Sequence, residues 1–402
     1  MKYAILIGDG MADRPLESLG GKTPLEVAST PWMDSMASQG VLGLVNTIPQ
    51  GFSPGSDIAN LVILGYDPAV HYTGRGPLEA ASMGVELAPG DVAFRCNLVH
   101  LSLGEPKPRM VDFTAGHIGT EKARALLQIL DKALSEKEIR FYPGVSYRHL
   151  MVWREGPLRL KTVPPHDITG QEIESHLPQG QGADKLLRLM ELSQETLRSQ
   201  SVLEVLGGES LHPPNSIWPW GQGAAPRLEP VVQKLGIRGA MITAVDLLKG
   251  LGRYAGFRIL DVPGATGYLD TDYAAKGRYA LGALEEGEDL VFVHVEAPDE
   301  AAHQGSLEEK IRAIESFDRD VVGQVLEGIR SWEEWAVLVL PDHATPLCLK
   351  THSSEPVPFA MLSSKGEHWG GERFCEAAAE KSSREILDGR EILERFVKGR
   401  WW

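Results

Sequence analysis

Carboxylate and imidazole side chains follow three short apolar runs of the sequence. The candidate metal ligands among them are Asp9, Asp299, His303, Asp342, His343 and, in a later loop, His352. Asp299 and His303 stand four positions apart, so on a helical turn they share one face and can hold one ion. Oxygen and imidazole ligands suit Mn²⁺, Zn²⁺, Co²⁺ or Mg²⁺ better than a thiolate-binding metal. The pattern therefore predicts a site for divalent metal ions.

Taken singly, these residues have common structural roles. An Asp often caps a helix, and a His is more often a hydrogen-bonded core or surface residue than a ligand. Their joint occurrence at the ends of three apolar runs favours the metal site. With Ser56 included, seven candidate ligands exceed what one ion requires. Two ions about 3.5 to 4 Å apart can stabilise both the attacking and the leaving oxygen in a displacement at phosphorus.

Ser56 is the candidate nucleophile. It lies in segment 53–60, where Pro54 and Gly55 predict a turn that leads into an apolar helix. A serine at a helix N-terminus faces free N–H groups and the positive end of the helix dipole, which favour an alkoxide and an attached phosphoryl group. The same position is also typical of a serine that only caps the helix. The segment alone leaves both roles open.

The elements that must position these residues are predicted from the apolar runs. Residues 3–7, 289–295 and 335–340 are nearly continuous aliphatic runs, which is typical of parallel strands buried on both faces. Residues 308–330 have apolar positions near helical spacing. Strands that alternate with helices predict an α/β fold with a largely parallel sheet, in which ligands bind outside the carboxyl ends of the strands.

The chain is 402 residues long, which exceeds the usual size of one hydrophobic core. Apolar runs and turn signals within residues 92–175 predict a smaller antiparallel α+β insert. We therefore expect a discontinuous main domain, residues 1–91 and 176–402, that carries the metal ligands, and an inserted substrate-binding cap domain, residues 92–175.

Composition narrows the class of protein. The net charge of -15 argues against a nucleic-acid-binding protein. No apolar run reaches the roughly 18 to 20 residues that cross a bilayer, so we expect no membrane contact and a cytoplasmic location. Three widely spaced cysteines fit neither a disulfide framework nor a cysteine-rich zinc site, and we expect them to be reduced.

Five short motifs together resemble those of one enzyme family. They are Gly8-Asp9-Gly10, Pro54-Gly55-Ser56-Asp57, Ala297-Pro298-Asp299 with His303, Pro341-Asp342-His343 and Thr351-His352-Ser353. The family is cofactor-independent (2,3-bisphosphoglycerate-independent) phosphoglycerate mutase, archaeal-type branch, in the alkaline phosphatase superfamily. The resemblance extends over nearly the whole chain and implies an alkaline-phosphatase-like domain with an inserted cap.

The resemblance also implies a ligand set and a mechanism. Asp299, His303 and His352 would bind one divalent ion. Asp9, Ser56, Asp342 and His343 would bind the other. Ser56 would accept the phosphoryl group from 2-phosphoglycerate or 3-phosphoglycerate and return it to the other hydroxyl of the glycerate, so no bisphosphoglycerate is needed.

Further residues are candidates for contact with a small phosphate ester. Lys276 resembles the family's lysine near the phosphoserine, and its alternative is an ordinary solvated lysine. Arginine binds carboxylates and phosphates bidentately, and the alternative for each arginine is a surface ion pair. The candidate substrate-binding residues are Arg75, Arg95, Arg148, His149, His166 and Asp167.

One segment departs from the family pattern. Archaeal-type mutases carry an Asp-Arg-Arg-Ala-Gly-Arg segment where this chain has Asp-Phe-Thr-Ala-Gly-His at residues 112–117. The departure resembles a bacterial subgroup proposed to phosphorylate homoserine, because an amino alcohol needs fewer arginines than a phosphate ester. The alternatives to a mutase are therefore a phosphotransferase to a small amino alcohol and a plain phosphatase.

Overall fold

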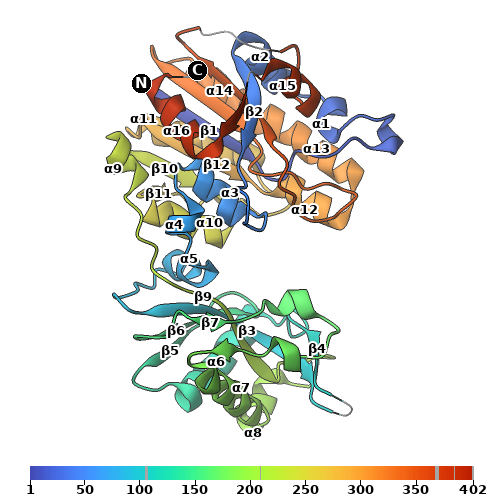
Figure 1. Cartoon of the computed structure of the whole chain (residues 1–402), viewed down its shortest axis with the longest axis vertical. Coiled ribbons are helices and arrows are strands. Elements are labelled where there is room, and N and C mark those ends of the chain that lie inside the picture. The colour runs from blue at the N-terminus through green and yellow to red at the C-terminus, as the bar shows by residue number, and fades with distance from the viewer. Residues whose placement is uncertain (105–106, 209, 367–370, 384, 401–402) are drawn as a thin grey trace. The chain divides into compact units, whose positions relative to one another are not determined.

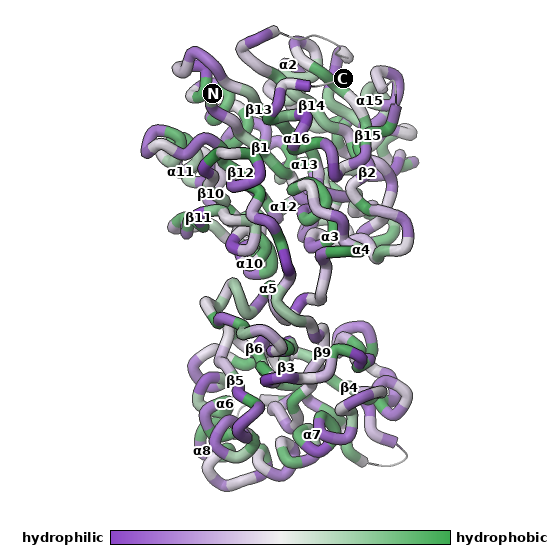
Figure 2. Tube along the Cα trace, turned by 60° about the vertical axis from the view of Figure 1, so that its left-hand side comes forward, coloured by the Kyte–Doolittle hydropathy of each residue, from purple (hydrophilic) through white to green (hydrophobic). Residues whose placement is uncertain are grey.

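A computed structural model describes residues 1–104, 107–208, 210–366, 371–383 and 385–400. The chain forms two compact units (Figure 1), the first made of residues 1–72 and 228–402 and the second of residues 73–227. In both units hydrophobic residues gather in the interior and hydrophilic residues along the outer loops (Figure 2). No helix within the described ranges has the length and apolar character needed to cross a membrane.

The first unit is built on a sheet of eight described strands. In spatial order they are β11 (Arg258–Ile259), β10 (Gly239–Ile242), β12 (Leu290–Val295), β1 (Lys2–Gly8), β13 (Trp335–Leu340), β14 (Val357–Ser363), β2 (Val41–Asn46) and β15 (Ile386–Asp388). The strands from β11 to β13 are all parallel, β14 is antiparallel to both of its neighbours, and β15 is parallel to β2. The predicted largely parallel sheet of an α/β fold is confirmed.

Helices surround this sheet and contribute to its buried core. They are α1 (Pro24–Val27), α2 (Pro31–Gln39), α3 (Ser56–Ile63), α4 (Pro68–His71), α9 (Val231–Leu235), α10 (Asp246–Tyr254), α11 (Tyr273–Glu285), α12 (Ala297–Gln304), α13 (Leu307–Phe317), α14 (Gln324–Ile329), α15 (Glu376–Ser382) and α16 (Gly389–Lys398), with a 3₁₀ turn at Glu17–Leu19. The helix predicted at 308–330 is present as α13 and α14, joined by a π-helical stretch, Asp318–Gly323. Asp318 accepts hydrogen bonds from the backbone N–H groups of Trp32 and Met33, which ties α2 to this stretch.

The three strands predicted from continuous apolar runs are neighbours in the sheet. β1 lies between β12 and β13 and is parallel to both, and every residue of β12 and β13 is buried. Because parallel strands have their carboxyl ends at one edge, the residues that follow them meet there. Asp9, Glu296 and Asp342 are those residues.

The second unit is an antiparallel α+β structure. Its main sheet contains β3 (Val92–Ser102), β4 (Arg109–Asp112), β5 (Ile139–Tyr142), β6 (Arg148–Trp153) and β9 (Ser216–Ala224), and β7 (Leu160–Lys161) pairs with β8 (Gln179–Gly180). Its helices are α5 (Arg75–Ser82), α6 (Thr120–Leu134), α7 (Ala183–Leu197) and α8 (Gln200–Leu206), with 3₁₀ turns at Pro165–Ile168 and Glu174–His176.

The boundaries of this unit differ from the predicted 92 and 175. Helix α5, before residue 92, packs on β3 and β9, and α7, after residue 175, packs on β9 and α6. Strand β9 itself pairs antiparallel with β3. The insert therefore extends over residues 73–227, because its sheet is completed by a strand far beyond the predicted end.

Candidate active site

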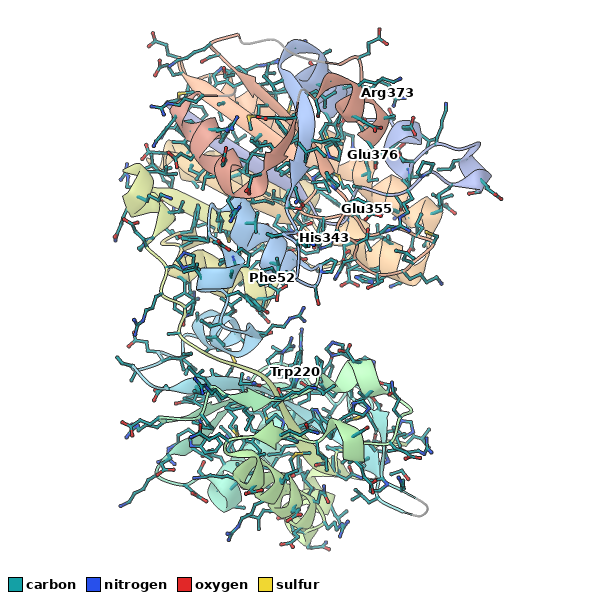
Figure 3. The ribbon with its side chains drawn as sticks, in the orientation of Figure 1. Phe52, Trp220, His343, Glu355, Arg373 and Glu376 are labelled. Atoms are coloured by element: carbon teal, nitrogen blue, oxygen red, sulfur yellow. The ribbon has the colours of Figure 1, made fainter. Side chains whose placement is uncertain are left out.

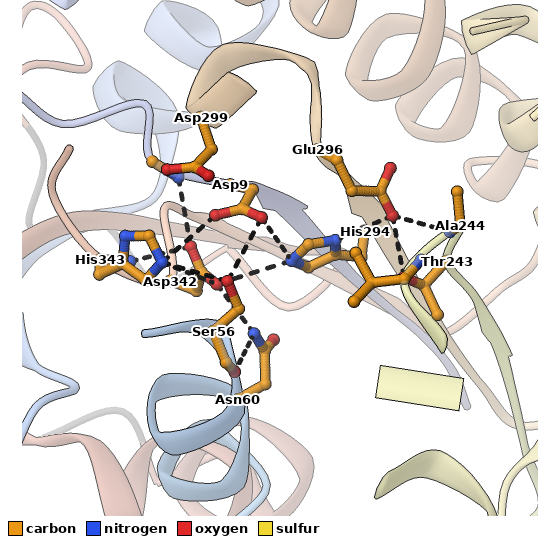
Figure 4. A network of polar contacts seen from close by, with 12 residues as sticks. Asp9, Ser56, Asn60, Thr243, Ala244, His294, Glu296, Asp299, Asp342 and His343 are labelled. Carbon is orange, nitrogen blue, oxygen red and sulfur yellow. Dashed lines mark hydrogen bonds and ion pairs between the residues drawn. The ribbon is translucent and has the colours of Figure 1, made fainter. Parts of the chain in front are cut away.

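The carboxyl edge of the central strands holds a cluster of buried ionisable groups (Figure 4). Asp9 follows β1, and Asp342 and His343 follow β13; their exposed fractions are 3%, 0% and 0%. Nε2 of His343 lies 3.4 Å from Oδ1 of Asp9. Oxygen or nitrogen atoms of these three residues lie within 4.8 Å of one another, a spacing that could hold a metal ion.

Ser56 lies at this group. It is the first residue of α3, Gly55 is the N-cap, and no side-chain capping bond is present. The hydroxyl of Ser56 instead donates to Oδ2 of Asp9 at 3.4 Å, and its Oγ lies 3.2 Å from Nε2 of His343. The capping role is thus excluded by this geometry.

Asn60 connects α3 to the strand edge. Its Nδ2 donates to Oδ2 of Asp342 at 2.8 Å and to the carbonyl of Ser56 at 2.8 Å. Oδ1 of Asp342 accepts from the backbone N–H groups of His343 at 2.9 Å and Gly10 at 3.3 Å. These bonds orient the Asp342 carboxylate relative to the serine.

A second group lies beside the first. Asp299, His343 and His352 could hold a metal ion by the same spacing. His303, on α12 like Asp299, has its Nε2 3.1 Å from Oδ2 of Asp299 and 3.0 Å from Nε2 of His352. All six predicted Asp and His ligands are thus gathered at one place, but His343 belongs to both groups rather than to one.

The electrostatics of the first group are compatible with a bound cation. Burial raises the pKa of Asp9 well above its usual value, and the neighbouring Asp342 raises it further. Burial also lowers the pKa of His343, which favours the neutral imidazole that binds metal ions. Oδ1 of Asp9 is buried and has no hydrogen-bond partner among the described residues. Buried, unpaired carboxylate oxygens are costly, so these side chains fit a divalent cation.

In the second group the charges are partly balanced within the protein. Burial alone would raise the pKa of Asp299, but hydrogen bonds from His303 and His352 lower it well below its usual value. The bond to Asp299 raises the pKa of His303 to about 9. Nδ1 of His303 lies 2.9 Å from the carbonyl of Lys350, which orients the ring with Nε2 toward Asp299.

Lys276 is not a solvated lysine. Its side chain is fully buried in α11, and its Nζ lies 2.7 Å from Oε2 of Glu296 and donates to the carbonyl of His294 at 2.8 Å. These contacts are to residues behind the candidate ligands, and within the described ranges the structure shows no bond from Lys276 to Ser56. The structure therefore links Lys276 to the serine only indirectly, through Glu296, His294 and Asp9.

Glu296 and His294 are the residues that sequence reasoning missed here. Oε1 of Glu296 accepts from Thr243 Oγ1 at 2.9 Å and from the N–H of Ala244 at 2.7 Å, and it lies 3.3 Å from Nδ1 of His294. Nε2 of His294 lies 3.5 Å from Asp9 Oδ2. Burial lowers the pKa of His294, but Asp342 and Glu296 raise it more strongly, to about 9. Their signal was visible, since Glu296 directly follows β12 as Asp9 follows β1, and His294 is the next-to-last residue of β12.

The second unit contains a cluster of arginines and aromatic rings. The guanidinium of Arg95 lies 4.6 Å from the ring centre of Trp220, which Figure 3 labels, and 3.4 Å from Oε1 of Glu79. Burial lowers the pKa of Arg95; Glu79 opposes this, and the charges of Arg75 and Arg148 lower the pKa further. The other two predicted substrate-binding arginines, Arg75 and Arg148, are thus close enough to act on Arg95.

His166 also belongs to this cluster, but His149 does not. The His166 ring lies 5.2 Å from that of Trp220, and its Nε2 is 3.5 Å from the exposed Asp167. His149 pairs across the sheet with buried Cys96, one position from Arg148, so its side chain lies on the opposite face. Burial lowers the pKa of His149 to about 3. Its neighbours are those of a core residue, not of a ligand-binding one.

Comparison with known proteins identifies the family. A family model described as 2,3-bisphosphoglycerate-independent phosphoglycerate mutase matches residues 37–202. A probable 2,3-bisphosphoglycerate-independent phosphoglycerate mutase of Geobacter sulfurreducens is 50% identical over 398 residues, which cover 99% of this chain and 100% of the relative. The chain belongs to the 2,3-bisphosphoglycerate-independent phosphoglycerate mutase family.

A further relative of the same name agrees, and two solved structures have a similar fold. The enzyme so named in Methanosarcina barkeri is 49% identical over 403 residues, all of both chains. A solved structure of a Pyrococcus horikoshii protein has a TM-score of 0.83 at 28% identity, covering 99% of this chain and 96% of that one. The cofactor-independent phosphoglycerate mutase of Thermoplasma acidophilum, 24% identical with a TM-score of 0.68 over 99% of each chain, shares the fold. These relatives give no support to the predicted alternative of transfer to homoserine.

Proposed function

We propose that this chain interconverts 2-phosphoglycerate and 3-phosphoglycerate by transferring the phosphoryl group through Ser56. The observation that carries the proposal is the position of Ser56 Oγ, 3.4 Å from Asp9 and 3.2 Å from His343, at a helix N-terminus. Membership of the mutase family supports the reaction. The helix dipole and the free N–H groups of α3 favour negative charge at this serine.

The transfer has two balanced halves. In the first, Ser56 Oγ forms a bond to phosphorus and the bond from phosphorus to the substrate oxygen breaks. Ser56 loses one proton, and the released glycerate oxygen gains one to become a hydroxyl. In the second, the other hydroxyl of the same glycerate attacks the phosphoserine, and Ser56 regains a proton. The phosphoryl group never passes to a bisphosphoglycerate.

Two divalent ions, of Mn²⁺, Zn²⁺, Co²⁺ or Mg²⁺, are part of the proposal. Asp299, His303 and His352 would hold one, and Asp9, Ser56, Asp342 and His343 the other. Bound ions would neutralise the phosphoryl oxygens and lower the pKa of the serine hydroxyl. The unpartnered Oδ1 of Asp9 supports a cation at this place.

Arg75, Arg95 and Arg148 are proposed to bind the carboxylate or phosphate of the substrate, with His166 and Asp167 at the edge of the cluster. Arg95 is well suited because its guanidinium lies against Trp220 and is largely withdrawn from water. A charge-assisted bond to a desolvated arginine is stronger than one to a solvated arginine.

Segment 112–117, which lacks the arginines of the family pattern, has a structural role in this chain. Asp112 accepts hydrogen bonds from Thr114 N at 2.7 Å, Thr114 Oγ1 at 2.6 Å and Gly116 N at 2.8 Å. Ala115 and His117 have positive φ angles, so the carboxylate stabilises a strained turn. The three arginines elsewhere in the unit supply positive charge that this segment does not.

The proposal is tested by an enolase-coupled assay with 3-phosphoglycerate and added Mn²⁺ or Co²⁺. We expect turnover by the parent chain and none by Ser56→Ala, with a phosphoserine detected by mass spectrometry only when Ser56 is present. Ser53→Ala, an exposed serine of the same loop, is the matched control and should retain activity. A folded parent chain that binds Mn²⁺ but leaves 3-phosphoglycerate unchanged would contradict the proposal.

A further inference from the structure

A lysine and an aspartate form an ion pair in the interior of the first unit. The side chains of Lys310, on α13, and Asp13, after β1, are both fully buried, and Nζ lies 2.8 Å from Oδ2. Neither residue belongs to the candidate ligand groups or to the proposed substrate-binding cluster. Because a buried ion pair rarely adds net stability compared with apolar residues, another role for the pair has to be considered.

The ammonium group of Lys310 connects two ligand-bearing segments. Besides Asp13, its Nζ donates to the carbonyl oxygens of Thr345 at 2.8 Å and Ala12 at 3.3 Å, so each of its three protons has an acceptor. Ala12 lies in the segment after β1 that carries Asp9, and Thr345 lies in the loop after β13. Lys310 itself is on the helix that follows α12.

Asp13 holds the same loop at a second point. Both of its carboxylate oxygens accept from the N–H of Leu347, at 3.3 and 3.2 Å. The N–H of Asp13 donates to Oε1 of Glu376 at 3.0 Å, and Thr23 Oγ1 donates to the other oxygen of Glu376 at 2.7 Å. Glu376, at the start of α15, is labelled in Figure 3. The loop backbone is therefore held at Thr345 and Leu347 by one buried network.

Thr345 transmits this restraint to the ligands. Its Oγ1 donates to Oδ1 of Asp299 at 2.5 Å and lies 3.2 Å from Nδ1 of His343. Its N–H donates to the carbonyl of Ala12 at 3.1 Å. His343 belongs to both candidate groups, so a displacement of Thr345 would disturb both.

We propose that Asp13 and Lys310 are positioning residues for the candidate metal centre. Through Thr345 they hold Asp299 and His343 at the separations that ion binding requires. The inference rests on the proposed metal site but assigns a role to two residues that contact neither ions nor substrate.

The test measures the affinity of the full chain for Mn²⁺. Electron paramagnetic resonance reports the concentration of free Mn²⁺, and titration calorimetry gives an independent dissociation constant. The variants are Lys310→Met, which keeps the length of the side chain, and Asp13→Asn, which keeps its shape. Asp318→Asn is the matched control, because Asp318 is an equally buried carboxylate whose hydrogen bonds go to α2 and not to a ligand-bearing segment. Circular dichroism and thermal unfolding monitor the fold of each variant.

We expect the Mn²⁺ dissociation constants of Lys310→Met and Asp13→Asn to rise by roughly 10–100-fold, as is usual when residues that orient metal ligands are removed. Asp318→Asn should bind Mn²⁺ like the parent. If Lys310→Met does not fold, Asp13→Asn and Thr345→Val decide the question. Folded variants with the parent's Mn²⁺ affinity would overturn the inference, and so would an equal loss in Asp318→Asn. A parent chain that binds no Mn²⁺ would instead overturn the proposed metal site itself.

Discussion

Replacement of Lys276 by methionine separates two roles for this residue. The resemblance to the mutase family implies a lysine next to the phosphoserine, whereas the structure shows a fully buried Lys276 paired with Glu296 at 2.7 Å. If the ion pair is the principal contact, Lys276→Met leaves the Glu296 carboxylate buried without its strongest partner. Lys276→Met should then mainly lower the free energy of unfolding and reduce kcat only as a secondary effect.

The size of the effect follows from the contacts of Glu296. Breaking a buried pair by removing one partner costs about 3–5 kcal/mol. Glu296 keeps the hydrogen bonds from Thr243 and Ala244 and its contact with His294, so we expect the lower limit, about 3 kcal/mol. For a unit of this size each kcal/mol lowers the midpoint of thermal unfolding by about 2–4 °C, which gives a decrease of roughly 6–12 °C.

Differential scanning calorimetry of the full chain measures this decrease. Lys249→Met is the matched control, because Lys249 forms a 2.7 Å ion pair with the exposed Asp261 and should cost less than about 1 kcal/mol. The double variant Lys276→Met, Glu296→Gln removes both buried charges and should recover much of the lost stability.

The activity of the variants completes the test. Because Glu296 contacts His294, and His294 lies 3.5 Å from Asp9, we expect kcat to fall in Lys276→Met and to recover in part in the double variant. A Lys276→Met protein that unfolds at the parent's temperature yet has lost all turnover would refute this reasoning. It would show that the lysine acts directly on the reacting groups.

Three further predictions follow from single contacts. Gly10→Ala should weaken Mn²⁺ binding, because a Cβ on Gly10, at φ +60°, would lie 2.6 Å from Asp299 Oδ1. The control Gly20→Ala, at φ +65° in open space, should lower stability but not Mn²⁺ affinity. Equal Mn²⁺ affinity of the two variants would contradict the prediction. Burial raises the pKa of Asp318 from 3.8 to about 6. Its contribution to folding stability is therefore full below the unfolded pKa near 3.8 and is lost as the pH rises through about 6. In urea titrations the free energy of unfolding of the parent, relative to that of Asp318→Asn, should fall by about 3 kcal/mol over this pH range. Arg95→Met should lower kcat/KM for 3-phosphoglycerate by about 10–100-fold. The control Arg124→Met removes an arginine in an exposed pair with Glu121 and should leave kcat/KM unchanged. Equal effects of the two changes would exclude a contact between Arg95 and the substrate.

The central strands and the gathering of the ligands could be predicted because their signals are local. Each of β1, β12 and β13 is a nearly continuous apolar run, and Asp9, Asp299, Asp342 and His343 lie within a few residues of a strand end. Parallel strands bring such ends to one edge without any knowledge of strand order. The strand ends alone did not divide the ligands between two ions, and the proximity of His343 to both candidate groups depends on side-chain directions.

The extent of the insert could not be predicted, for a reason seen in β9. This strand contains Pro219 and Gly221, and both residue types argue against a strand in a sequence pattern. In the structure Pro219 pairs with Cys96 of β3. The neighbouring tryptophans supply the burial that makes the strand stable, with Trp218 1% and Trp220 3% exposed. Packing across the sheet, not local preference, determines the boundary.

The residues that hold the ligands illustrate the limit of sequence reasoning most clearly. Asp13 and Lys310 are 297 positions apart, and the two segments give no sign in isolation that they meet. A charged residue within a helical pattern is read as solvent-exposed, yet both side chains are fully buried. Such a pair is stable only if every proton and oxygen has a partner, and here the partners are backbone groups of the ligand-bearing segments. Because those partners must keep their places for the charges to stay buried, we infer that the folding of the unit and the geometry of the proposed metal centre depend on the same bonds.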